Sequence, residues 1–182
     1  MMRGTLSIYS FIEKLKSEIL RKGWITRKIS CKRNESVAEH CFEMSNLAML
    51  IKRELNLNFL NMEKVYEMIN IHEYGESIIG DWIDGPNVDK SKKHIVELEA
   101  VEHVVREHKD SQYFIDLWNE FEERKTKEAI FVFVIDKIQA VLQSKQYSKE
   151  CNLPELFIEF YDDYKKRVIE KDEFSISKIL EQ

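Results

Sequence analysis

The chain has 182 residues, with 33 acidic and 28 basic side chains and a formal net charge of −5. A chain of this length buries enough apolar surface to fold as one domain without disulfides or a structural metal. The acidic balance disfavours a general attraction to nucleic-acid polymers or membranes, so a small molecule or a protein is the expected partner.

The cysteines Cys31, Cys41 and Cys151 are odd in number and include no CxxC pair. They are therefore interpreted as reduced thiols, and neither a disulfide framework nor a cysteine zinc site is predicted. Charged residues interrupt the N-terminal apolar run, which argues against a signal peptide, and no apolar run reaches membrane-spanning length. We therefore expect a cytoplasmic protein.

Apolar residues recur at three- and four-residue steps, which predicts an all-α fold of about six to eight helices in one domain over residues 1–182. A first helix is expected over residues 7–21, followed by an irregular basic loop. Ser36 and Glu39 match a capping box, with Ser36 as the N-cap. This predicts a second helix over residues 37–54.

Asn61 is the expected N-cap of a third helix, which carries His72 on its buried face. Gly75 and Gly80 bracket a short helical turn, and the composition of residues 84–87 indicates a loop. Further helices are expected over residues 91–107, with Ile95 and Val101 facing inward, and over residues 111–123, 129–143 and 154–170, with a short helix in the tail.

Residues 129–143 contain a β-branched and aromatic run that also fits a buried strand. A solitary strand has no partner in this chain, so we predict a buried helix. Within this run Asp136 is surrounded by apolar residues, and it is either a metal ligand or half of a buried ion pair with an arginine or lysine. Lys137 is expected to point elsewhere on the helix.

His40, His72 and Glu73 are further potential ligands in apolar surroundings. Side chains of adjacent residues on a helix diverge by about 100°, so His72 and Glu73 share one ion only where the helix ends, which Gly75 favours. For either histidine taken alone, a buried role with one backbone hydrogen bond is the favoured interpretation. Two imidazoles and two carboxylates suit one divalent Mn, Co, Fe or Zn ion better than Mg.

The ordered segments ESVAEH, IHEYGESIIGD and VIDKIQAVLQ resemble the HD superfamily of metal-dependent phosphohydrolases, and within it the 5′-deoxynucleotidase subgroup. The resemblance runs from GWITR to about residue 147. It implies an HD-type helical domain and a homodimer, with His40, His72, Glu73 and Asp136 as metal ligands. Position 73 departs from the family's aspartate, and the extra methylene of glutamate moves the carboxylate by roughly 1 Å unless the backbone or the rotamer compensates.

The resemblance also implies that Glu76 and Asp81 face the substrate. A carboxylate near the metal can orient water or accept its proton, and a second acid can protonate the leaving ribose oxygen. We assign the first role to Glu76 and the second to Asp81. Without the metal motif, both would be interpreted as solvated charge at a helical turn.

Trp24, Arg27 and Lys28 precede His40 and are the expected substrate-binding residues, because an aromatic face can stack on a base and cations can bind phosphate. The alternative places Trp24 in the core and leaves the basic residues in solvent.

The expected function is removal of the 5′-phosphate from nucleoside monophosphates, chiefly deoxyribonucleotides. Within the enzyme class the alternative is another phosphate ester, such as a cyclic nucleotide or a ppGpp-like substrate. A catalytically weakened nucleotide-binding regulatory protein is the alternative raised by Glu73.

Overall fold

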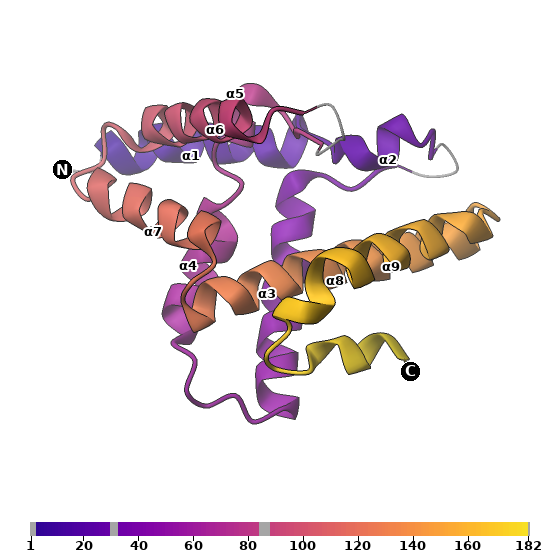
Figure 1. Cartoon of the computed structure of the whole chain (residues 1–182). Coiled ribbons are helices and arrows are strands. Elements are labelled where there is room, and N and C mark those ends of the chain that lie inside the picture. The colour runs from indigo at the N-terminus through magenta and orange to yellow at the C-terminus, as the bar shows by residue number, and fades with distance from the viewer. Residues whose placement is uncertain (1–2, 30–32, 84–87, 182) are drawn as a thin grey trace.

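The computed structural model describes residues 3–29, 33–83 and 88–181, and these residues form the helices drawn in Figure 1. The predicted all-α class is confirmed. None of the helices described is long and apolar enough to cross a membrane. In chain order the elements are α1 (Arg3–Ser17), α2 (Lys22–Thr26), α3 (Val37–Glu54), α4 (Met62–Ile71), α5 (Glu76–Ile79), α6 (Lys90–Val105), α7 (Ser111–Glu123), α8 (Lys127–Glu150), α9 (Pro154–Val168) and the 3₁₀ helices η1 (Ile169–Lys171) and η2 (Ile176–Glu181).

Side-chain caps determine where the helices around the site begin. The Ser36 hydroxyl accepts from the Glu39 amide at 3.3 Å, while the Glu39 carboxylate accepts from the Ser36 amide at 2.7 Å. This confirms the predicted capping box at the start of α3. Asn61 Oδ1 accepts from the Lys64 amide at 3.3 Å, which confirms the predicted cap of α4.

Some expectations differ from the structure. Helix α1 begins and ends four residues earlier than predicted, and part of the expected basic loop forms α2. The loop expected at residues 84–87 lies outside the described residues. Ile95 is 54% exposed instead of facing inward, because it lies six residues before buried Val101 and therefore about 120° around α6 from it.

The cysteines also differ from the expectation. Cys151 is disulfide-bonded, so its interpretation as a reduced thiol is wrong. Cys41 is free and buried, as expected. Cys31 lies outside the described residues.

Helix α8 forms the centre of the core. It lies beside α9, and α3, α4 and α7 also pack against it (Figure 1). All side chains of residues 131–136 are buried, so the run that also fitted a strand forms a helix covered on every side. This packing brings the first turns of α3 and the end of α4 to the middle of α8, where Asp136 lies.

Candidate metal centre

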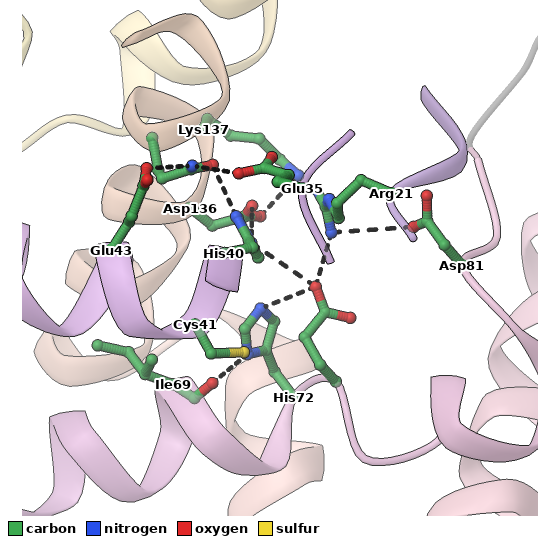
Figure 2. Close-up of polar contacts among 12 residues, drawn as sticks. Arg21, Glu35, His40, Cys41, Glu43, Ile69, His72, Asp81, Asp136 and Lys137 are labelled. Atoms are coloured by element: carbon green, nitrogen blue, oxygen red, sulfur yellow. Dashed lines mark hydrogen bonds and ion pairs between the residues drawn. The ribbon is translucent and has the colours of Figure 1, made fainter. Parts of the chain in front are cut away.

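Three helical elements bring the four predicted metal ligands together. His40 lies in the first turns of α3, His72 is the C-cap of α4 followed by Glu73, and Asp136 is on α8. Figure 2 shows the imidazoles of His40 and His72 directed toward the same space. One ligand atom from each of His40, His72 and Glu73 lies within 4.8 Å of the others. Asp136 Oδ1 is 3.3 Å from His40 Nε2.

Both histidines are oriented by their Nδ1 atoms. Nδ1 of His72 lies 2.8 Å from the carbonyl oxygen of Ile69, and Nδ1 of His40 lies 2.6 Å from Gln139 Oε1. Their Nε2 atoms are buried and make no hydrogen bond in the described part of the chain. An imidazole that donates through Nδ1 presents a lone pair at Nε2, which is the arrangement of a metal ligand. The donor set therefore fits a divalent cation.

Glu73 presents one oxygen to both histidines and to Arg21. Its Oε1 lies 3.4 Å from His72 Nε2, 3.7 Å from His40 Nε2 and 2.8 Å from Arg21 Nη1. Burial alone would raise the pKa of Glu73, but His72, Arg21 and His40 together hold it below its usual range. Because α4 ends at Ile71, the side chains of the adjacent residues His72 and Glu73 can converge, as the sequence predicted.

Asp136 divides its two oxygens between two neighbours. Oδ1 faces His40, whereas Oδ2 lies 2.7 Å from Lys137 Nζ. The expectation that Lys137 points elsewhere is wrong, because its flexible four-carbon side chain folds back to its neighbour. Burial would raise the pKa of Asp136, but Lys137 and His40 hold it well below its usual range. One anionic oxygen thus remains directed at the histidines.

The two predicted catalytic acids lie beside this cluster. Glu76 is only 9% exposed, and its buried Oε2 has no hydrogen-bond partner among the described residues. Burial, and then the charges of Glu73 and Asp81, raise the pKa of Glu76 well above its usual value. Asp81 accepts a hydrogen bond from the Lys22 amide and lies 3.8 Å from Arg21 Nη1 (Figure 2). Glu76 therefore lies within the electrostatic field of both Glu73 and Asp81.

Arg21 is a site residue that the sequence analysis missed. Its guanidinium contacts Glu73 and lies near Asp81, between the candidate ligands and the second acid. The basic segment was expected to be an irregular loop, so no face was assigned to it. Arg21 is the N-cap of α2, and a helical spacing of three residues relates it to Trp24. No local pattern marks Arg21, because its contact with Glu73 joins residues that are far apart in the sequence.

Trp24, Arg27 and Lys28 are not brought to the metal cluster. Trp24 is 2% exposed and its ring stacks on Phe160 at a centroid distance of 4.7 Å, so the expectation that it stacks on a base is wrong. Arg27 pairs with Glu159 on α9, and Lys28 is exposed just beyond α2. The contacts of Trp24 and Arg27 with α9 hold α2 in place.

The chain is similar to known proteins over most of its length. A profile of the family described as HD domain matches residues 12–175. The 5′-deoxynucleotidase HDDC2 of Homo sapiens is 30% identical over 162 residues, which cover 88% of this chain and 76% of that protein. The 5′-deoxynucleotidase hdd1 of Schizosaccharomyces pombe is 31% identical over 156 residues, which cover 81% and 76%.

Solved structures show the same fold. A conserved hypothetical protein from Pyrococcus furiosus has a TM-score of 0.70 at 24% identity, covering 97% of this chain and 94% of that one. A predicted metal-dependent phosphohydrolase from Magnetospirillum magnetotacticum has a TM-score of 0.67 at 20% identity, covering 99% and 91%.

Proposed function

The chain belongs to the HD-domain family of metal-dependent phosphohydrolases, and we propose on this premise that it removes the 5′-phosphate from nucleoside monophosphates, with deoxyribonucleotides preferred. One observation carries the proposal. The two buried Nε2 atoms of His40 and His72 have no hydrogen-bond partner among the described residues and lie beside Glu73 Oε1. Burial of two such lone pairs is costly unless a cation binds them.

The proposed ligands are His40, His72, Glu73 and Asp136. A divalent cation bound there would polarise the phosphate ester and make water more acidic. Transition-metal ions such as Mn, Co, Fe or Zn suit this mixture of imidazole and carboxylate better than Mg, which prefers oxygen ligands.

The remaining side chains of the site provide the roles that ester hydrolysis needs. We assign Arg21 to bind a phosphate oxygen, because its guanidinium lies beside Glu73 and Asp81 and carries more N–H donors than these two contacts use. We assign to Glu76 the orientation of the attacking water and acceptance of its proton, a role that its buried oxygen without a partner in the described chain supports. We assign protonation of the leaving ribose oxygen to Asp81 in its acid form. The proton that Glu76 takes from water balances the proton that Asp81 gives, so that ester and water become alcohol and inorganic phosphate.

A substrate screen tests this proposal. Metal-stripped protein is supplied with Mn²⁺, Co²⁺ or Mg²⁺, and phosphate release is measured from deoxyribonucleotides, ribonucleotides, cyclic nucleotides and a ppGpp-like compound. We expect the highest kcat/KM for 5′-deoxynucleoside monophosphates with Mn²⁺ or Co²⁺. Turnover of cyclic nucleotides but not of monophosphates would contradict the proposal.

A matched pair of variants separates chemistry from folding. Glu76→Gln is expected to lower kcat by roughly 10²- to 10⁴-fold while the variant still binds metal, because it removes a proton acceptor and no proposed ligand. Glu102→Gln, at an exposed position of α6, is the control and should keep wild-type kcat.

A further inference from the structure

The Nδ1 edge of His40 faces a buried polar cluster formed by Glu35, Glu43 and Gln139 (the Gln139 cluster). Gln139 is 0% exposed on α8 and follows Asp136 by three residues, so both side chains lie on the same face of the helix. Its Nε2 lies 3.1 Å from Glu35 Oε2 and 2.8 Å from Glu43 Oε2. Figure 2 shows Glu35 and Glu43 next to His40.

The two carboxylates determine which way the amide of Gln139 points. Only the NH₂ group of an amide donates hydrogen bonds, and carboxylates only accept them. A flipped amide would place its oxygen against Glu35 and Glu43 with no hydrogen between them. The oxygen of Gln139 therefore faces His40, and it can only accept. Nδ1 of His40 must carry the hydrogen, which leaves the Nε2 lone pair unprotonated in the neutral ring.

We propose that Gln139 is a positioning residue which, held by Glu35 and Glu43, keeps His40 in the tautomer whose Nε2 lone pair faces Glu73 and Asp136. This inference rests on the proposed metal site and adds a residue that contacts neither metal nor substrate. It acts only through the imidazole that it orients.

The Gln139 cluster is itself anchored to α2 and to the end of α8. The indole Nε1 of Trp24 donates to Glu35 Oε1 at 2.8 Å, and the Tyr147 hydroxyl accepts from the Glu35 amide at 3.0 Å. A continuous path of hydrogen bonds thus connects Trp24, Glu35, Gln139 and His40. Each link is buried, where an unsatisfied partner is costly.

The two histidines differ in how their tautomers are fixed. The Nδ1 partner of His72 is the backbone carbonyl of Ile69, which no side-chain substitution removes. The Nδ1 partner of His40 is a side chain. Substitution of Gln139 should therefore alter His40 and leave His72 unchanged, which gives an internal control within one protein.

The test compares wild-type protein with Gln139→Met, a substitution of similar length that removes the amide. Nitrogen NMR of the metal-free proteins reports the histidine tautomers, with the His40 signals assigned by their loss in His40→Gln. Calorimetric titration with Mn²⁺ reports metal affinity. We expect the Nδ1–H tautomer at His40 in the wild type and a mixture in Gln139→Met. We also expect metal affinity to fall by about 10- to 100-fold.

Gln143→Met is the matched control. Gln143 is also buried on α8, four residues further along. This variant loses a buried amide without losing the partner of His40, so its metal affinity should equal that of the wild type.

The outcomes separate the two proposals. A wild type that binds no Mn²⁺ would overturn the proposed metal-dependent function. A wild type that binds Mn²⁺ but has the Nε2–H tautomer at His40 would overturn only the role of Gln139, whether or not the variant folds. Equal metal affinities and equal His40 tautomers in the wild type and Gln139→Met would also overturn only the role of Gln139.

Discussion

Position 73 shows how one methylene can be accommodated at the candidate site. The resemblance to HD phosphohydrolases implies aspartate there, yet Glu73 Oε1 already lies near both Nε2 atoms and Arg21. Glu73 follows the C-cap of α4, just beyond the end of the helix. The backbone position there compensates for the extra length of the glutamate side chain. This argues against a binding site weakened by the substitution.

Glu73→Asp tests this interpretation. Shortening the side chain by one methylene should withdraw the carboxylate by roughly 1 Å and lower kcat/KM by about 10- to 100-fold. Steady-state kinetics with a 5′-deoxynucleotide measure the change, and Glu63→Asp, at an exposed position of α4, is the control. A nearly inactive wild type that gains activity as Glu73→Asp would support the regulatory alternative.

Glu97 on α6 gives a prediction for the pH dependence of stability. Burial, with the nearby charge of Glu122, raises the pKa of Glu97 from 4.5 to about 7, although Lys93 opposes this shift. An acid whose pKa is raised in the folded state favours folding below its unfolded pKa, and this contribution is lost as pH rises through the folded value. The wild type should therefore lose stability between pH 4.5 and pH 7 through this group.

Glu97→Gln removes the charge that causes this loss. We expect the variant to exceed the wild type by about 1 kcal/mol in free energy of unfolding at pH 8, a value discounted for partial exposure. The advantage should disappear at pH near 4.5, where Glu97 is largely protonated. Denaturant unfolding at both pH values measures it. An equal change in the exposed control Glu99→Gln would contradict this explanation.

At the scale of elements, α2 packs through its buried Trp24 against the Gln139 cluster and α9. Trp24 connects the Gln139 cluster to α9, because its nitrogen bonds to Glu35 and its ring stacks on Phe160. Trp24→Phe keeps the ring and removes the donor. It should cost about 1–2 kcal/mol in free energy of unfolding and leave KM for a nucleotide unchanged. A large increase in KM at unchanged stability would favour the base-stacking role expected from the sequence.

Helix α1 docks through a glycine against the turn after α6. A Cβ at Gly4 would lie 2.3 Å from the carbonyl oxygen of Glu107 and 2.7 Å from Cα of His108. Gly4→Ala should therefore lower stability by about 2 kcal/mol, because backbone atoms must move.

Gly23→Ala is the matched control for this packing contact. Its nearest atom would be Arg27 Nη1 at 3.8 Å, and alanine favours the helical conformation of α2. Thermal unfolding should show a lower Tm for Gly4→Ala and no loss for Gly23→Ala. Equal losses in both variants would contradict the close approach of α1.

Local capping chemistry made several elements predictable from the sequence. The hydrogen bonds of Ser36 and Asn61 involve residues three positions away, so the starts of α3 and α4 are determined by neighbouring residues. Whether residues 22–26 form a helix depends instead on contacts with α8 and α9, including those of Trp24 with Tyr147 and Phe160. Such distant contacts are invisible in a local pattern.

At the scale of the whole molecule, the order of the motifs predicted which four residues converge from three elements. It did not predict Arg21 or Gln139. Both could be placed only after the helices around them were packed, because Arg21 depends on α2 and Gln139 on the approach of α3 to α8. The same limitation applies to Cys151, whose disulfide depends on tertiary proximity and not on sequence spacing.

The most direct test of the account is anomalous X-ray diffraction from crystals of the wild-type protein grown with Mn²⁺. We predict one strong anomalous peak per chain, in contact with side chains of His40, His72, Glu73 and Asp136, and its loss in His72→Ala. A peak elsewhere, or crystals without a bound ion in which Arg21 still pairs with Glu73, would contradict the proposed metal centre.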